Sequence, residues 1–254
     1  MQTSTISLQD KVAVITGASR GLGRAMALAL GGAGARLALV SRDRAKLDET
    51  AAQAAAIGAE AAVFQTDVTN EEQVRRLERD VAGRFGRADI LINNAGIAVR
   101  KTVVDYTLEE WRSVMDTNLT SVFLMCRSFV PHMRGRGYGR IINISSIMGH
   151  VSLPLRSAYS ASKAGVLGFT RALALEVADD GIAVVAISPG PFATEMTAPL
   201  RNSADPLAQL NASVPMARWG EPEEVGSLAL FLCSDGAAYI TGTDVVIDGG
   251  WTAR

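Results

Sequence analysis

Most of the strand-like segments in this sequence are continuous runs of apolar residues, without alternation of polar and apolar positions. Such runs are typical of parallel strands that are buried on both faces of a sheet. The segments are Val12–Thr16, Leu37–Ser41, Ala61–Thr66, Ile90–Asn93, Ile141–Ser145, Ile182–Ser188 and Asp244–Ile247. The pattern therefore predicts a buried and largely parallel sheet.

Helical patterns separate these segments. The helical stretches are Asp43–Ile57, Glu71–Phe85, Leu108–Met133, Ala158–Val177 and Pro222–Cys233. Repeated β-α-β units imply right-handed crossovers, which place helices on both faces of the sheet. We therefore expect an α/β protein with a single doubly wound (Rossmann) domain over residues 1–254, built on a seven-stranded, mostly parallel sheet.

The longest irregular stretch begins near Pro189 and ends near Gly220, and it is rich in proline. A connection this long inside a compact domain is usually a functional loop. We expect the segment at about residues 190–215 to form a lid over the substrate.

Composition excludes several classes of protein. The chain is 48% hydrophobic and 20% charged, with a formal net charge of −1 and a pI of about 6.2. This balance gives no electrostatic basis for binding nucleic acid or an anionic membrane. The N-terminal residues lack the apolar stretch of a signal peptide, and no run of about 18 apolar residues occurs. These features predict a soluble, cytoplasmic protein.

The residues that often bind metals are scattered. Cys126 and Cys233 lie in apolar, helix-like surroundings, which predicts two reduced thiols in the core rather than a disulfide framework. His132 and His150 lie apart from any second histidine, cysteine or carboxylate cluster. We expect no metal site.

Three glycines follow the first predicted strand. Gly17, Gly21 and Gly23 lie between this strand and an Ala- and Leu-rich helix. Glycines at such a junction allow a tight turn and a close approach of a pyrophosphate to backbone N–H groups, and the helix N-terminus attracts the anion. A glycine-rich turn without a ligand is the alternative, but the position after the first strand favours a dinucleotide site.

The spacing of these glycines is T-G-x-x-x-G-x-G, and further motifs follow in order along the chain. They are Asp67-Val68, Asn93-Asn94-Ala95-Gly96, Asn118, Ser146, Tyr159-x-x-x-Lys163 and Pro189-Gly190. Together the motifs resemble those of the short-chain dehydrogenase/reductase family, and the resemblance covers essentially all 254 residues. It implies an NAD(P)-dependent oxidoreductase that interconverts a ketone and a secondary alcohol by hydride transfer.

The resemblance also implies which residues bind the cofactor. Asp67 and Val68 would hold the adenine, and the backbone at Phe192 would hold the nicotinamide carboxamide, with Thr194 nearby. The full expected set is Gly17, Ser19, Arg20, Gly21, Leu22, Gly23, Ser41, Arg42, Asp67, Val68, Asn94, Ala95, Gly96, Tyr159, Lys163, Pro189, Gly190, Phe192 and Thr194.

The end of the second strand indicates which nicotinamide cofactor is used. Enzymes that prefer NAD usually place an acidic residue there, next to the ribose hydroxyls. This strand ends in Ser41, followed by Arg42, and Arg20 of the glycine loop would lie nearby. Guanidinium groups bind a 2′-phosphate, so we predict NADP(H). Asp43 precedes a helical stretch and is better explained as its N-cap.

Tyr159 and Lys163 are four residues apart in a helical segment, so they project from one face. A free tyrosine has a pKa of about 10, which a nearby lysine cation would lower. In a random helix such a pair has no implied function. Ser146, near the end of the fifth strand, would bind the substrate oxygen by resemblance to the family, although Ser145 is a competing candidate. Asn118 matches the fourth catalytic residue, and its amide would bend the helix and anchor a proton relay.

The substrate is less certain than the reaction. The chain resembles both 3-oxoacyl-carrier-protein reductases and gluconate 5-dehydrogenase-like enzymes. Leu175 stands where the carrier-protein reductases commonly have a basic residue before Glu176, which weakens that assignment. A non-catalytic NADP(H) sensor, an epimerase and a dehydratase are further alternatives. The family commonly forms tetramers, so we expect a homotetramer assembled through the two long helices and the C-terminal strand.

Overall fold

The protein is described by a computed structural model over residues 6–195, 197–198 and 214–253. Seven strands form one sheet in the order β3-β2-β1-β4-β5-β6-β7. Their bounds are β1 Val12–Thr16, β2 Arg36–Ser41, β3 Ala61–Gln65, β4 Ile90–Asn93, β5 Gly139–Ile144, β6 Ile182–Pro189 and β7 Asp244–Ile247. Every neighbouring pair is parallel, so the predicted doubly wound fold is confirmed.

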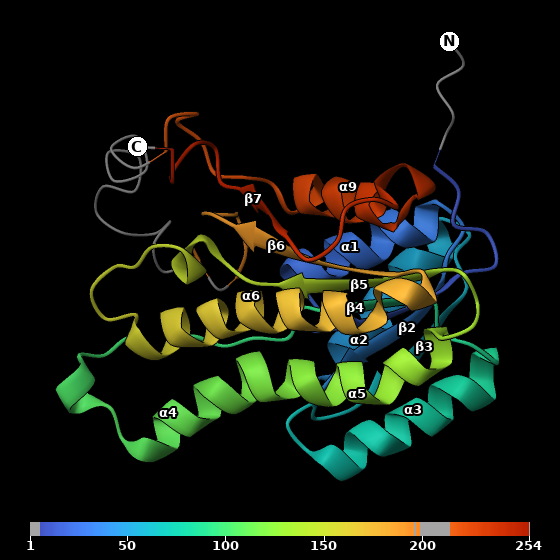
Figure 1. The fold of residues 1–254 in the computed structure, drawn as a ribbon, viewed down its shortest axis with the longest axis horizontal. Helices are drawn as coiled ribbons and strands as arrows, with labels where there is room; N and C mark the ends of the chain where they lie inside the picture. Colours follow the sequence, from blue (N-terminus) through green and yellow to red (C-terminus); the bar gives the residue numbers. More distant parts are fainter. Residues whose placement is uncertain (1–5, 196, 199–213, 254) are drawn as a thin grey trace.

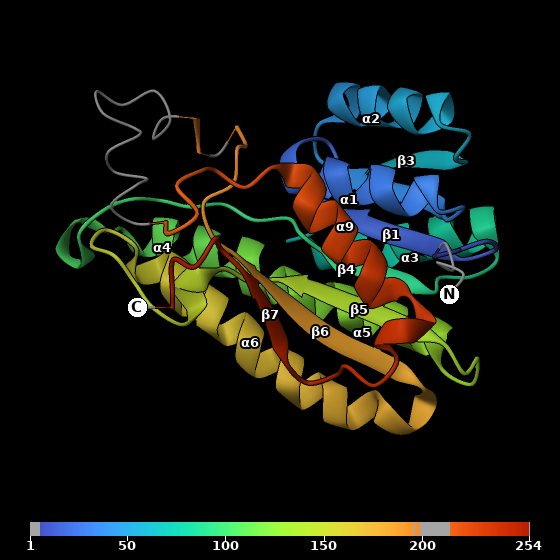
Figure 2. The same ribbon diagram turned by 90° about the horizontal axis from the view of Figure 1, so that it is seen from above.

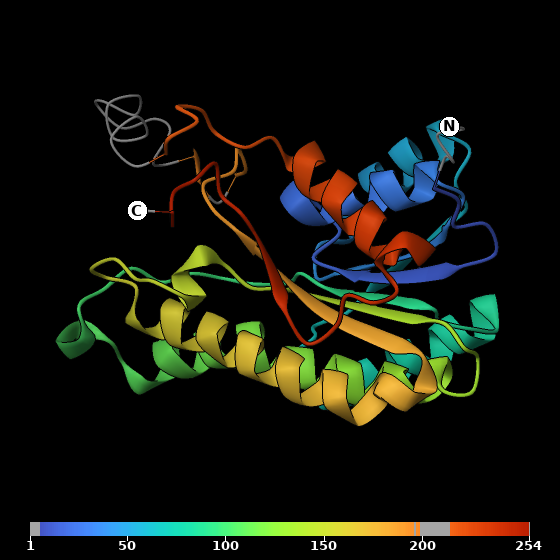
Figure 3. The same ribbon diagram turned by 45° about the horizontal axis from the view of Figure 1, so that its top comes forward.

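Helices cover both faces of this sheet (Figure 1). On one face lie α1 (Gly21–Gly32), α2 (Arg44–Ala56) and α9 (Pro222–Cys233), with α9 beside α1 (Figure 2). On the other face lie α3 (Glu71–Phe85), α4 (Leu108–Met115), α5 (Ser121–Met133) and α6 (Ser157–Val177) (Figure 3). Short 3-10 turns occur at Val103–Asp105, Ile147–Gly149, Ala178–Asp180 and Asp235–Ala237.

The apolar side chains of the strands pack into two hydrophobic cores, one on each face of the sheet. Successive side chains of a strand point to opposite faces of the sheet. In β1, Ile15 therefore packs with Leu30 and Leu47 under α1 and α2, whereas Val14 packs with Leu77 and Phe129 under α3 and α5. Both faces of the strand are buried, which is why no alternation is visible in the sequence. Cys126 and Cys233 are buried free thiols, as predicted.

The predicted helix Leu108–Met133 is wrong in one respect. A π-helical turn at Asp116–Thr120 separates α4 from α5, and Asn118 lies in this turn. The buried Asn118 amide binds the backbone of Ile97 in both directions, with its Oδ1 accepting from the Ile97 N–H at 2.8 Å and its Nδ2 donating to the Ile97 carbonyl at 2.9 Å. π-turns interrupt helices in this way and often occur at functional sites.

The remaining boundaries differ from the predictions by one or two residues. The fifth strand begins earlier, at Gly139, and ends at Ile144, so Ser145 and Ser146 follow it rather than close it. Within the described residues, no helix has both the length and the apolar character needed to cross a membrane. The lid expected at about residues 190–215 includes residues 196 and 199–213, which lie outside the described residues.

Candidate active site

A cavity of about 820 Å³ opens at the carboxyl ends of the strands. Its walls come from the loop between β1 and α1 and from the ends of β2 to β6. The strand order reverses between β1 and β4, and open α/β sheets bind their ligands at such a switch point. The volume suits a drug-sized or cofactor-sized molecule.

The glycine loop forms the floor of this cavity. Gly17 and Gly21 have φ angles of 65° and 53°, in the left-handed region that favours glycine. A Cβ atom on Gly23 would lie 2.2 Å from the Gly17 carbonyl oxygen and 2.5 Å from Asn94 Nδ2. The Asn94 amide itself donates to the Thr16 and Gly17 carbonyls, at 3.0 and 3.2 Å. No larger side chain fits at Gly23 without moving this backbone.

The first turn of α1 opens toward the same cavity. No side chain caps this helix, since its N-cap residue Arg20 makes no capping hydrogen bond. The exposed N–H groups and the helix dipole therefore favour an anion here. The loop and helix together fit the pyrophosphate of a dinucleotide, which agrees with the sequence prediction.

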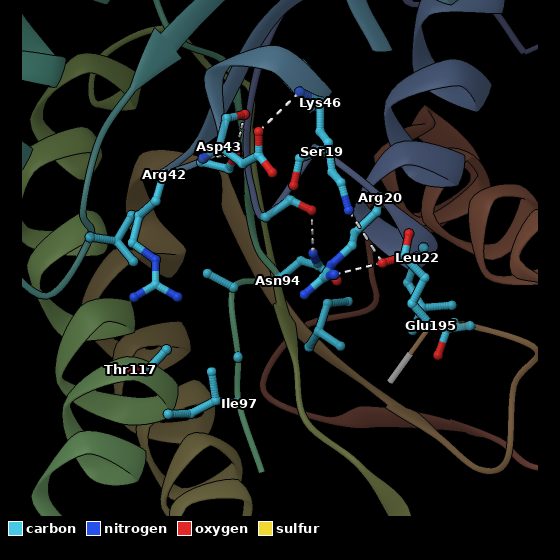
Figure 4. Close-up of a pocket in the computed structure, with 18 of the residues that line it drawn as sticks. Ser19, Arg20, Leu22, Arg42, Asp43, Lys46, Asn94, Ile97, Thr117 and Glu195 are labelled. Atoms are coloured by element: carbon cyan, nitrogen blue, oxygen red, sulfur yellow. Dashed lines mark hydrogen bonds and ion pairs between the residues drawn. The ribbon is translucent and has the colours of Figure 1, made fainter. Parts of the chain in front are cut away.

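Charged side chains collect at the adenosine-binding end expected for such a ligand (Figure 4). The cations of this part of the cavity wall are Arg20, Arg42, Arg44 and Lys46, and Arg44 is paired with Asp48. Asp43 is an N-cap, as predicted, because its Oδ1 accepts from the Lys46 N–H at 3.1 Å. Glu195 pairs with Arg20 at 2.6 Å and with Lys46 at 3.5 Å. Neither Lys46 nor Glu195 was among the residues predicted from the sequence.

Tyr159 and Lys163 lie at the other end of the cavity, on the first turns of α6. The Lys163 ammonium is 5.7 Å from the centre of the Tyr159 ring and donates to the Ile144 carbonyl at 2.7 Å. Ser146 follows β5 and hydrogen-bonds with the Tyr159 side chain. The Ser145 hydroxyl instead donates to the Lys163 carbonyl at 2.9 Å. Of the two serines, therefore, Ser146 is the one directed at Tyr159.

The expected effect of Lys163 on Tyr159 is wrong for this arrangement. Burial raises the pKa of Tyr159 above its usual value, only partly opposed by the hydrogen bond to Ser146 and the charge of Arg156. Burial also lowers the pKa of Lys163 to about 8. Desolvation penalises the charged form of both groups, so Tyr159 is a protonated phenol at neutral pH.

Asn118 supports this site from behind. Its Nδ2 also donates to the Ser162 hydroxyl at 3.0 Å, and Ser162 donates to the Tyr159 carbonyl at 2.7 Å. A Cβ atom on Gly96 would lie 3.3 Å from Asn118 Oδ1 and 3.6 Å from Lys163 Nζ, so all three residues are neighbours. Ser162, which the sequence analysis missed, links the π-turn to the turn of α6 that carries Tyr159.

The structure brings nearly all of the expected site residues to one cavity. Gly23 and Asn118 are the two that do not line it, because they lie directly behind its wall. The predicted residues that line it are Gly17, Ser19, Arg20, Gly21, Leu22, Ser41, Arg42, Asp67, Val68, Asn94, Ala95, Gly96, Ser146, Tyr159, Lys163, Pro189, Gly190, Phe192 and Thr194.

The family follows from comparison with known proteins. Residues 17–252 match the family model described as enoyl-(acyl carrier protein) reductase. The chain belongs to the short-chain dehydrogenase/reductase family, as its motifs indicated, and it is an oxidoreductase that acts on CH–OH and C=O groups.

Relatives match the chain over almost its full length. The 3-oxoacyl-[acyl-carrier-protein] reductase of Synechocystis sp. is 42% identical, covering 96% of this chain and 98% of its own. A candidate gluconate dehydrogenase from Agrobacterium tumefaciens is 36% identical with a TM-score of 0.95, covering 98% of both chains. A candidate NAD(P)-dependent gluconate 5-dehydrogenase from Beutenbergia cavernae, solved with NADP at low occupancy, is 38% identical with a TM-score of 0.93, covering 98% of this chain and 99% of its own.

The raised pKa of Tyr159 predicts opposite pH dependences for the two directions of the reaction. Proton donation needs the phenol, which is present at neutral pH and lost only above the pKa of Tyr159. Proton removal needs the phenolate, whose population grows about tenfold per pH unit below that pKa. Between pH 6 and 8, kcat/KM for alcohol oxidation should rise steeply while kcat/KM for ketone reduction stays nearly constant. Steady-state kinetics in both directions would test this, and a flat oxidative profile would contradict it.

Proposed function

We propose that the protein interconverts a ketone and a secondary alcohol and uses NADP(H) in preference to NAD(H). One observation carries this proposal: a single cavity has Tyr159, Ser146 and Lys163 at one end and Arg20, Arg42 and Lys46 at the other. A proton donor for a carbonyl oxygen and cations for a 2′-phosphate thus face one binding space. When bound, the reduced nicotinamide supplies a hydride to the carbonyl carbon.

In the reductive direction, Tyr159 donates its phenolic proton to the carbonyl oxygen. The high pKa of Tyr159 keeps that proton in place at neutral pH. Ser146 hydrogen-bonds to the same oxygen and polarises the carbonyl. In the oxidative direction the roles reverse, with the phenolate accepting the hydroxyl proton.

Lys163 and Asn118 support this proton transfer. Lys163 is held at the Ile144 carbonyl with its Nζ 5.7 Å from the centre of the Tyr159 ring, where it can pass a proton on. Asn118 fixes the backbone of Ile97 on one side and Ser162 on the other, beside the lysine. We infer that this arrangement holds one end of a proton path from Tyr159 through Lys163 toward solvent.

Tyr159→Phe tests the proton donor. The variant keeps the ring and loses only the hydroxyl, so kcat should fall by about 10²- to 10⁴-fold. NADPH binding, followed by titration of its fluorescence, should change little. Tyr239→Phe is the matched control, because Tyr239 is fully exposed and does not line the cavity. Near-normal turnover by Tyr159→Phe would refute the assignment.

The cofactor preference is tested by kcat/KM with NADPH and with NADH. We expect the value for NADPH to be the larger. Arg42→Ala should narrow the difference, because Arg42 lines the cavity next to Ser41 and no carboxylate among the described residues pairs with it. Arg76→Ala, on the exposed surface of α3, provides a control for the loss of one cation. A higher kcat/KM with NADH in the unaltered protein would overturn the proposed preference.

A 3-oxoacyl thioester is the first substrate class that we propose. The support is the Synechocystis relative, a 3-oxoacyl-[acyl-carrier-protein] reductase. One local feature weakens this assignment: Leu175 is 84% exposed at the place where those enzymes commonly carry a basic docking residue. An acyl chain carried on a smaller thiol is compatible with that surface.

A sugar acid is the second candidate, and a pair of arginines favours it. Arg156 is half-buried three residues before Tyr159, and burial together with the nearby Arg100 lowers its pKa. The charge interaction with Tyr159 raises the pKa of Arg156 in part, so this cation lies close to the reacting group. A carboxylate on the substrate would be attracted to both arginines.

Initial rates with 3-oxoacyl thioesters, 5-keto-gluconate and neutral ketones, read by NADPH absorbance, separate these candidates. If the sugar acid is the substrate, Arg156→Leu should raise its KM at least tenfold and leave the KM of a neutral ketone unchanged. If the thioester is the substrate, 5-keto-gluconate should be reduced slowly by the unaltered protein. Activity on none of these compounds would contradict both candidates.

We also propose assembly into a homotetramer through α4, α5, α6 and β7. Apolar side chains stand exposed on the first two of these helices, including Leu108 at 61% and Phe123 at 44%. Val246 on the edge strand β7 is 40% exposed. Large apolar side chains left exposed on a protein surface are often covered by a partner. The helix that carries Tyr159 and Lys163 would then be braced by a neighbouring subunit.

A further inference from the structure

Glu195 connects two parts of the cavity that lie far apart in the sequence. Its carboxylate reaches back to Arg20 in the glycine loop, at 2.6 Å, and to Lys46 in the first turn of α2, at 3.5 Å. Figure 4 shows both cations converging on Glu195, while Arg42 extends separately. All four side chains line the same cavity.

Hydrogen bonds shape the turn next to Glu195. The Thr197 hydroxyl donates to the Phe192 carbonyl at 2.6 Å and accepts from the Thr194 N–H at 3.1 Å, which closes a compact turn. Thr194 packs on the glycine loop, since a Cβ atom on Gly21 would lie 3.5 Å from its methyl carbon. The turn therefore directs Glu195 toward Arg20 and Lys46.

The charges at this end of the cavity suit a dianion. Four cations line it, Arg20, Arg42, Arg44 and Lys46, together with three carboxylates, Asp43, Asp67 and Glu195. Asp43 is engaged as a helix cap, Asp67 accepts from the Thr69 hydroxyl, and Arg44 pairs with Asp48. A phosphate monoester carries about −1.5 to −2 charges at neutral pH and accepts several charge-assisted hydrogen bonds. Glu195 supplies only one negative charge to two of these cations. A phosphate is the stronger partner for the same groups.

We propose that Glu195 competes with the 2′-phosphate of NADP(H) for Arg20 and Lys46, and thereby sets how strongly the protein discriminates between NADP(H) and NAD(H). This inference rests on the proposed cofactor preference. NADPH must break the Glu195 ion pairs when it binds, whereas NADH has no 2′-phosphate and leaves them intact. The hydrogen bond from Arg20 also lowers the pKa of Glu195, which keeps its carboxylate ionised at neutral pH. Glu195 is thus a specificity-determining residue, although it lies outside the second strand where such residues are usually sought.

The experiment is a comparison of dissociation constants, measured by nicotinamide fluorescence, for NADPH and NADH. Glu195→Gln should lower the dissociation constant for NADPH by about two- to fivefold, the scale of an exposed ion pair. The constant for NADH should stay unchanged. Glu60→Gln is the matched control, because it also removes an exposed, ion-paired carboxylate but lies outside the cavity. Circular dichroism melting curves would show that the variants are folded.

A second background separates competition from simple charge repulsion. In the double variant Arg20→Ala/Lys46→Ala, Glu195 has lost both partners, so Glu195→Gln should no longer change NADPH affinity. If its effect persists there, Glu195 acts by repulsion through space and the proposed competition is wrong. An unchanged NADPH constant for Glu195→Gln in the otherwise unaltered protein would also overturn it. A preference for NADH in the unaltered protein would refute only the proposed cofactor preference, because the effect of Glu195→Gln on NADPH is measured separately.

Discussion

Parallel pairing of the strands is the constraint on which the rest of this structure depends. Parallel strands need crossover connections, and the helices in those connections bury both faces of the sheet. The same arrangement brings the carboxyl ends of β1 to β6 to one edge, where the loops that follow them meet. Gly17 and Thr194 therefore line the same cavity, although most of the chain lies between them. The location of the site therefore follows from the topology of the sheet alone.

Buried polar contacts then fix the geometry that the topology allows. Asn118 lies in the π-turn that interrupts the helix. Its side-chain amide forms hydrogen bonds with Ile97 and Ser162. Each hydrogen bond contributes only about 1 kcal/mol, but leaving such a buried group without a partner costs more. Removing one partner from this hydrogen-bond network would therefore lower the stability of the protein, and the network maintains the interruption of the helix. This network joins the turn of α6 that carries Tyr159 to the segment after β4 that contains Ile97.

Local apolar and helical patterns were sufficient for the fold, and the resemblance to the short-chain dehydrogenase/reductase family supplied most residues of the cavity wall. Apolar runs predicted the strands, and the glycines after the first strand predicted the tight loop in which Gly17 and Gly21 have positive φ angles. Contacts between distant segments were not predictable. Glu195 meets Arg20 across 175 residues, and nothing near Glu195 in the sequence indicates that partner. Residues 108–133 were predicted as one helix bent at Asn118; the π-turn itself was not predicted, because it depends on the contacts of the Asn118 amide with Ile97 and Ser162. The direction of the pKa shifts of Tyr159 and Lys163 depends on burial, which spacing along a helix does not reveal.

The position of Lys163 has a further chemical consequence. A lysine whose pKa is about 8 is partly a neutral amine under physiological conditions, and a neutral amine next to a ketone is a nucleophile that forms a Schiff base. Lys163 as a whole is only 4% exposed. Its Nζ donates to the Ile144 carbonyl, and its backbone carbonyl accepts from the Ser145 hydroxyl. The first contact holds Nζ at the end of β5, and the second fixes the backbone of α6 at the same residue. A neutral Lys163 still has hydrogens to donate, so the same contact with the Ile144 carbonyl can hold the side chain in both protonation states.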